Sequence, residues 1–225
     1  KVDTISIASV AESGVLIDHN GNRASEMIAW FDNRSQPIID RLTLEQRKAV
    51  YEITGIPPNA HYSASKIRWL LENGLDLGQT YTWLCIPDYL VYRFTGEICT
   101  EYSIASRTMV LDLKERTWSE SVKKIFGIEN VRFPKLLAAG ETAGTIKPEV
   151  SEESKLNKDV VLTIAGHDHM VGSISSQQGK NELLDSTGTT EGVLLLTDNL
   201  EIDKVNPNDC IAFGIYQNPK LYTEF

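Results

Sequence analysis

The sequence places a carboxylate between two histidines, at the point where a predicted strand is followed by a predicted helix. The apolar run 160–164 is typical of a buried strand and residues 170–178 of a helix, with His167, Asp168 and His169 between them. In α/β proteins, reactive groups often lie at the carboxyl ends of such strands. Asp168 is therefore a candidate general base for a substrate hydroxyl. It could equally be the N-cap of the helix, a position that favours aspartate.

The same three residues allow a second chemistry, because imidazole and carboxylate groups are metal ligands. A metal-dependent hydrolase that used His167, Asp168 and His169 would need further histidines or carboxylates at suitable spacing. The sequence has four histidines, and the other two, His19 and His61, lie in segments typical of turns. We therefore predict no metal-binding residues and keep the hydrolase as the weaker hypothesis.

A second polar turn, Ser186 to Thr190, lies between two further apolar runs. Its backbone N–H groups and hydroxyls, those of Gly188, Thr189 and Thr190 above all, suit contacts with phosphate. A simple β-hairpin turn is the alternative interpretation. The chain lacks the Gly-x-x-x-x-Gly-Lys pattern of a P-loop, which excludes that class of nucleotide-binding site.

Three other residues could bind a polyhydroxylated ligand, although each also has a structural interpretation. Glu12 lies in a turn between two strand-like runs, where a glutamate is usually solvated. Trp69 lies beside the apolar face of an amphipathic helix predicted over residues 63–73, which is also typical of a core residue. Tyr102 lies in a predicted loop, and only a minority of loop aromatics take part in binding.

The composition limits the choice of partners and compartment. Acidic residues outnumber basic ones by 31 to 22, for a formal net charge of -9, which argues against nucleic acid or an anionic membrane as the main partner. The three cysteines, Cys85, Cys99 and Cys210, are widely spaced, and this favours a reducing, cytoplasmic compartment. No apolar run approaches the roughly 18 residues of a transmembrane helix, and no signal peptide is visible.

The elements that must position these residues form a mixed α/β pattern. Thr43 and Gln46 form a capping box at the start of a helix. Residues 131–157 are polar and contain prolines, and they are predicted to form loops with short strands. Strands and a helix then alternate quickly, as in a compact α/β unit. We predict two domains, residues 1–178 and 179–225.

Four segments, taken together, resemble the FGGY carbohydrate kinases, a family that includes glycerol kinase, xylulokinase and gluconate kinase. Their order and spacing agree with the family over nearly the whole chain. The segments are Trp30 to Arg34 (Trp-x-Asp-x-Arg in the family), Ser63 to Asn73 (the Lys-x-x-Trp helix), Thr100 to Met109 (similar to Asp-x-x-Asn-Ala-Ser-Arg-Thr-Met of glycerol kinase), and Ala165 to His169 with Ser186 to Thr190 (the catalytic-aspartate and second phosphate motifs).

The resemblance implies a fold and a role for each candidate residue. The fold would be the actin-like ATPase (ribonuclease H-like) fold, with most of the sugar-binding lobe in residues 1–178 and the start of the ATP-binding lobe in 179–225. Asp168 would be the general base. The other implied roles are substrate binding for Glu12, Trp69, Tyr102 and His169, and contacts with ATP phosphates for Gly188, Thr189 and Thr190.

The implied activity is ATP- and Mg²⁺-dependent phosphorylation of a sugar or polyol hydroxyl, and the alternative is a non-catalytic sugar-binding or regulatory protein on the same fold. Ala11 replaces an arginine of glycerol kinase, so a substrate larger than glycerol is expected. The family's first phosphate loop would precede Lys1, and most of the ATP lobe would follow Phe225. We therefore expect an internal fragment that is inactive by itself. The sequence does not specify the oligomeric state, and a homodimer is one assembly that it allows.

Overall fold

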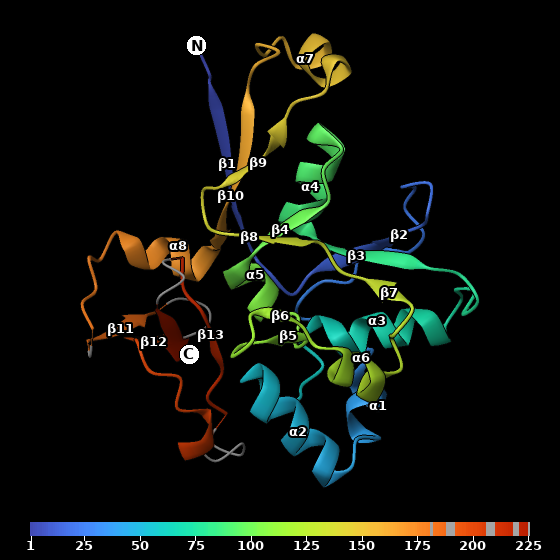
Figure 1. Ribbon diagram of the computed structural model, residues 1–225, viewed down its shortest axis with the longest axis vertical. Coiled ribbons are helices and arrows are strands. Elements are labelled where there is room, and N and C mark those ends of the chain that lie inside the picture. The colour runs from blue at the N-terminus through green and yellow to red at the C-terminus, as the bar shows by residue number, and fades with distance from the viewer. Residues whose placement is uncertain (181, 188–191, 206–209, 218–220, 225) are drawn as a thin grey trace.

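The computed structural model describes residues 1–180, 182–187, 192–205, 210–217 and 221–224, and its elements are labelled in Figure 1. The strands are β1 (Thr4–Ser9), β2 (Gly14–Ile17), β3 (Tyr81–Cys85), β4 (Cys99–Glu101), β5 (Leu111–Asp112), β6 (Thr117–Trp118), β7 (Val131–Arg132), β8 (Lys135–Leu137), β9 (Thr142–Thr145), β10 (Val161–His167), β11 (Leu183–Ser186), β12 (Gly192–Thr197), β13 (Phe213–Ile215) and β14 (Tyr222–Glu224). The α-helices are α1 (Gln36–Asp40), α2 (Leu44–Thr54), α3 (Ser63–Glu72), α4 (Ile86–Thr95), α5 (Tyr102–Ser106), α6 (Glu120–Phe126), α7 (Pro148–Ser154) and α8 (Asp168–Ile174), and a 3₁₀ helix covers Ile202–Lys204.

The strand that leads to the candidate site pairs with the first strand of the chain. β10 lies between β1, to which it is parallel, and β9, to which it is antiparallel (Figure 1). The parallel register ends with Ser9 opposite His167. Because parallel strands end at the same edge of a sheet, residues just after β1 and just after β10 come together.

The largest core cluster connects this sheet with a second sheet, of order β2-β3-β7, and with the helices around it. Trp83 on β3 and Ile67 on α3 are among its largest fully buried side chains. Helix α4 contacts β10, β9 and β1, and so covers one face of the first sheet. The segment between β1 and β2, which contains Glu12, passes from one sheet to the other and is held at both ends.

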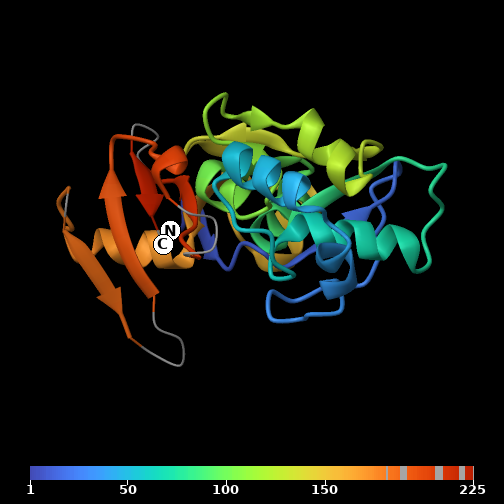
Figure 2. The same ribbon diagram turned by 90° about the horizontal axis from the view of Figure 1, so that it is seen from below.

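The last strands form a separate sheet at one side of the molecule, seen in Figure 2, with the order β11-β12-β14-β13. A small core of Met170, Leu194, Leu196 and Tyr216 joins this sheet to α8. Helix α8 thus packs on the last sheet while its first residue follows directly from β10. The beginning of α8 is a junction between the two parts of the structure.

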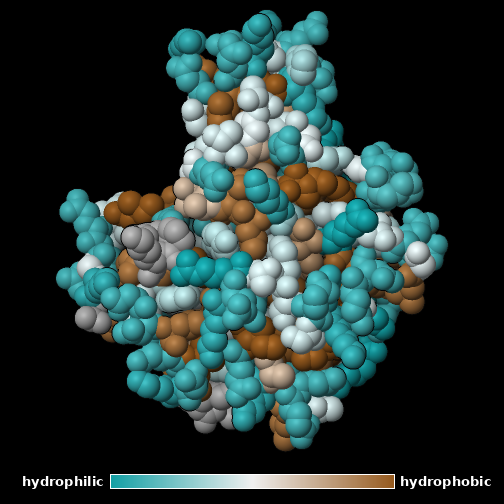
Figure 3. Space-filling model, in the orientation of Figure 1, coloured by the Kyte–Doolittle hydropathy of each residue, from teal (hydrophilic) through white to brown (hydrophobic). Residues whose placement is uncertain are grey.

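The face shown in Figure 3 is mainly hydrophilic, and its hydrophobic side chains lie in small separate groups. Among the described residues, no helix has the length and apolar character needed to cross a membrane.

Several expectations from the sequence are confirmed. Thr43 and Gln46 form the predicted capping box, with Gln46 N donating to Thr43 Oγ1 at 3.2 Å. The strand predicted over 160–164 is present and extends to His167. The helix predicted over 170–178 is present but covers Asp168–Ile174, so it begins and ends earlier than predicted.

Two of the described α-helices were not predicted. Helix α5 begins at Tyr102, which was expected to lie in a loop, and the Glu101 side chain caps it by accepting from the N–H groups of Ser103 and Ile104. Helix α7 lies within the segment that was expected to contain only loops and short strands. It has a proline in its first turn and no buried residue, so the sequence shows no apolar period that would reveal it.

Gly166 lies at a tight contact near the end of β10. Its φ is +128°, and a Cβ atom there would lie 2.6 Å from Ser103 Oγ and 3.0 Å from Glu101 Oε2. Ser103 Oγ accepts a 2.9 Å hydrogen bond from the backbone N–H of His167 and donates to Glu101 Oε2 at 2.5 Å. A side chain at this position would therefore displace the network that holds the turn before Asp168.

We expect Gly166→Ala to lower the free energy of unfolding by about 1–3 kcal/mol, because it combines an unfavourable φ with a steric clash. Gly172→Ala is the matched control, since a Cβ atom added at this position in α8 would have no neighbouring atom within 4 Å. That change should be neutral or stabilise by about 0.5–1 kcal/mol. Urea unfolding followed by circular dichroism measures both, and equal effects of the two substitutions would contradict the role given to Gly166.

Candidate functional site

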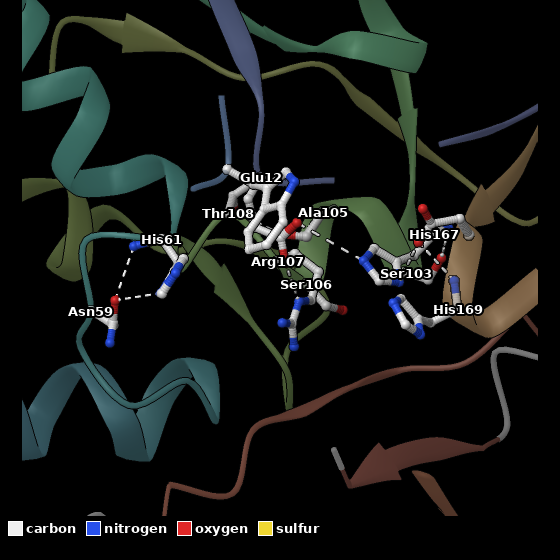
Figure 4. Close-up of polar contacts among 12 residues, drawn as sticks. Glu12, Asn59, His61, Ser103, Ala105, Ser106, Arg107, Thr108, His167 and His169 are labelled. Carbon is white, nitrogen blue, oxygen red and sulfur yellow. Dashed lines mark hydrogen bonds and ion pairs between the residues drawn. The ribbon is translucent and has the colours of Figure 1, made fainter. Parts of the chain in front are cut away.

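A cavity of about 340 Å³ lies where these segments meet. Its walls come from the link between β1 and β2, the loop before α1, the residues before α3, the end of α5 and the start of α8. The described residues that line it are Val10, Glu12, Trp30, His61, Tyr62, Arg107, His167, Asp168, His169 and Gly192. Figure 4 shows the polar side chains as a row from His61, through Glu12 and Arg107, to His167 and His169.

An ion pair with little exposure to solvent lies at the centre of this row. Arg107 Nε donates to Glu12 Oε1 at 2.8 Å, and the Arg107 guanidinium lies 5.1 Å from the centre of the Tyr62 ring. Burial by itself would raise the pKa of Glu12, but the charge of Arg107 and its hydrogen bond lower that pKa to about 2. Glu12 is only 6% exposed, so it is not the solvated turn residue of the structural interpretation.

His167 lies between this ion pair and Asp168. Its Nε2 is 3.9 Å from Glu12 Oε2, and its Nδ1 is 3.6 Å from Asp168 Oδ1. Nδ1 is buried and has no hydrogen-bond partner among the described residues. Burial lowers the pKa of His167 to about 4, so the ring is neutral at pH 7.

Asp168 does not cap α8. The N-cap residue is His167, which makes no side-chain cap, and Asp168 is the first residue of the helix itself. Its Oδ1 accepts from the backbone N–H of His169 at 2.8 Å, and its side chain is 51% exposed. The His169 ring stacks on His167, with ring centroids 5.5 Å apart. The Asp168 carboxylate is therefore accessible at the cavity wall, as the functional interpretation requires.

Asp168 also lines a second cavity, of about 420 Å³. Four of its described lining residues are serines; the full lining is Asp168, His169, Gly172, Ser173, Ser175, Ser176, Leu184, Asp185 and Ser186. The two cavities share Asp168 and His169. Two groups, one bound in each cavity, could thus meet at the Asp168 carboxylate.

One buried lysine connects three walls of the first cavity. The Lys66 ammonium donates to the carbonyl oxygens of Glu12 (3.3 Å), Trp30 (3.2 Å) and His61 (2.5 Å). Burial lowers the pKa of Lys66 to about 8, while the charge of Glu12 acts in the opposite direction. The side chain is fully buried and does not line the cavity, so its function is structural support.

Two predicted substrate-binding residues do not line the first cavity. Trp69 packs against the main core, and the Arg34 guanidinium lies 5.1 Å from the centre of its ring. Tyr102 is the first residue of α5 and packs against a smaller core cluster that contains Tyr51 and Phe213. Their roles in binding remain predictions, as do those of Gly188, Thr189 and Thr190, which lie outside the described residues.

The structure adds residues to which the sequence gave no role in the site. Trp30 and Arg107 belong to the motifs that carried the family resemblance, so membership in those motifs was the available signal. His61 was interpreted as part of a turn, yet its ring stacks on Trp30 with centroids 5.9 Å apart. Tyr62 immediately precedes α3, and no local pattern distinguishes it.

The described residues include no group of three or more His, Cys, Asp or Glu side chains arranged to hold a metal ion. The geometry around His167, Asp168 and His169 therefore gives no support to the hydrolase hypothesis.

Comparison with known proteins identifies the family. The family model described as "FGGY family of carbohydrate kinases, N-terminal domain" matches residues 1–175. The chain belongs to the FGGY family of carbohydrate kinases. Glycerol kinase of Thermococcus kodakarensis is 26% identical to this FGGY chain over 221 residues, which cover 96% of the chain and 44% of that protein.

Solved structures show the fold. Xylulose kinase from Lactobacillus acidophilus superposes with a TM-score of 0.89 at 21% identity, covering 100% of this chain and 46% of that one. Gluconate kinase from the same organism gives 0.87 at 20% identity, with 100% and 45% covered. The chain therefore has the actin-like ATPase fold of FGGY kinases and spans less than half the length of each of these relatives.

The neutral state of His167 has a consequence for stability. Its pKa is about 4 in the folded chain and about 6.5 when unfolded, so between these values the unfolded chain binds more protons. The free energy of unfolding should therefore fall as the pH is lowered from 7 to 4.5. The fall should be smaller in His167→Gln than in the parent protein, by up to about 3 kcal/mol.

Urea unfolding at the two pH values measures this difference. His19→Gln is the control, because the His19 side chain is exposed. This substitution should leave the pH dependence of the free energy of unfolding unchanged. If His167→Gln had the same pH dependence as the parent, His167 would not be held neutral by folding.

Proposed function

We propose that the full-length protein containing this chain transfers the γ-phosphoryl group of ATP to a hydroxyl of a sugar or polyol, with Asp168 as general base. The observation that carries this proposal is that Asp168 lies where two cavities meet. A sugar in the first cavity and the phosphate end of ATP in the second would approach each other at this carboxylate. Family membership supports the same assignment of reaction class.

The chemistry follows from the residues around the junction. The Asp168 side chain is 51% exposed at the cavity wall, so a substrate hydroxyl can lie within hydrogen-bond reach of its carboxylate. The hydroxyl donates its proton to Asp168 as its oxygen attacks the γ-phosphorus. The bond from phosphorus to the β,γ-bridging oxygen breaks, and ADP leaves. Positioning by the two cavities supplies most of the rate, as is usual for phosphoryl transfer.

The second cavity has the groups expected for the phosphate end of a nucleotide. Its serine hydroxyls can donate to phosphate oxygens, and the carboxylate of Asp185 is the type of ligand that Mg²⁺ takes together with phosphates. Bound Mg²⁺ would supply positive charge that offsets the negative charge on the phosphates. We extend the phosphate contacts to Gly188, Thr189 and Thr190, and we propose that residues 179–225 begin the ATP-binding lobe.

Asp168→Asn in the full-length protein should lower kcat by about 10²–10⁴-fold, because the amide cannot accept the hydroxyl proton. The affinity for ATP should change little, since the substitution is nearly isosteric. Asp40→Asn is the control, because Asp40 is exposed at the end of α1 and lines neither cavity. ADP release in a coupled assay measures both variants, and near-normal turnover by Asp168→Asn would refute the assignment of the base.

A further inference from the structure

The charged groups that line the first cavity limit the charge that its ligand can carry. Glu12 and Arg107 are paired at 2.8 Å, and their side chains are 8% and 13% exposed. The low pKa of Glu12 and the raised pKa of Arg107 mean that both are ionised at pH 7. The pair therefore contributes no net charge to the cavity.

The remaining ionisable side chains of the described lining include no lysine and no second arginine; they are Asp168, Tyr62, His61, His167 and His169. Asp168 contributes a second carboxylate. Burial lowers the pKa of His61 and His167, so these two rings are neutral at pH 7. Lys66 lies behind the wall, where its ammonium donates to three carbonyls. The described lining thus has two carboxylates against one guanidinium, which already donates to one of them.

A carboxylated sugar, such as an aldonate, would bring a third carboxylate into this cavity. It would be repelled by Glu12 and Asp168 and would have to compete with Glu12 for Arg107. A neutral polyol has no such cost, because each hydroxyl can donate to a carboxylate or accept from a guanidinium or imidazole N–H. The distinction between these substrates is therefore electrostatic and does not depend on their size.

We propose that the Glu12–Arg107 pair makes this site selective for neutral sugars and polyols over aldonates, an inference that rests on the sugar kinase function proposed above. The same fold occurs in a solved gluconate kinase, so the fold by itself does not decide between these substrate classes. In this chain, the ion pair between Arg107 and Glu12 decides between them.

The test compares neutral compounds with aldonates as substrates of the full-length protein. Xylulose, xylitol and glucitol are assayed beside xylonate and gluconate, with kcat/KM measured from ADP release. The best neutral compound should exceed the best aldonate by at least about tenfold. In Glu12→Gln, which removes the carboxylate but keeps the side-chain shape, the ratio of aldonate to neutral kcat/KM should rise by at least about tenfold.

Glu72→Gln is the matched control. Glu72 pairs with Arg41 at 2.7 Å and with Arg68 at 2.9 Å, away from both cavities, so its loss removes a carboxylate from an ion pair without changing the site. This variant should keep the parent's ratio. An aldonate preferred by the parent protein, or an unchanged ratio in Glu12→Gln, would overturn the proposal.

A binding measurement separates this inference from the proposed function. Isothermal titration calorimetry of the parent protein with the same compounds should detect a neutral sugar or polyol more tightly bound than any aldonate, whether or not ADP is released. Binding of a neutral compound without turnover would refute the kinase function and leave the charge selectivity supported. Tighter binding of an aldonate would refute the selectivity, including the case in which Glu12→Gln does not fold.

Discussion

The geometry of the first cavity depends on one buried ammonium group. Lys66 extends from α3 and donates to three backbone carbonyls, which belong to Glu12, Trp30 and His61. All three residues line the cavity, and they come from separate segments of the chain. Burying a charge is costly, and the cost is offset only where the charge is fully hydrogen-bonded. The three carbonyls meet that condition, so each wall is fixed relative to the other two.

This arrangement also explains why two of the sequence motifs occur together. The Trp-x-Asp-x-Arg segment supplies the Trp30 carbonyl to Lys66, and its Arg34 lies over the ring of Trp69, three residues beyond Lys66 on the same helix. Asp32 in turn accepts from Arg34 Nε at 2.9 Å. The loop before α1 and the helix α3 are therefore connected by two charged side chains, one from each motif.

Buried carboxyl groups near the site differ in charge because their partners differ. Glu12 has Arg107 and is ionised, whereas burial without a cation raises the pKa of Glu101 to about 7 and that of Asp88 to about 8. Glu101 accepts from the N–H groups of Ser103 and Ile104 at the start of α5. Through the Ser103 hydroxyl it also supports the backbone before Asp168. Glu12 is thus an ionised, paired group of the cavity lining, whereas Glu101 positions backbone.

The sequence predicted the elements whose signals are local. The capping box at Thr43 and the strand before His167 both follow from short patterns, and the structure confirms them. The sequence also identified Asp168 and Glu12, but only the structure shows that they line one cavity. The pairing of Glu12 with Arg107 joins residues that are distant in the chain, so no local pattern contains it. Helix α7 was missed because its residues are all accessible to solvent and carry no apolar period.

The parallel pairing of β1 with β10 has a consequence for the order in which the chain can fold. Strand β1 has this partner only after residues 161–167 have been synthesised, so its edge toward β10 stays unpaired while the residues between the two strands are made. Contacts of this sequence separation carry a large loop-closure cost and form slowly. The cavity walls contributed by Glu12 and His167 can then reach their final places only after this pairing has formed. During that interval, the exposed edge of β1 is a potential site of aggregation.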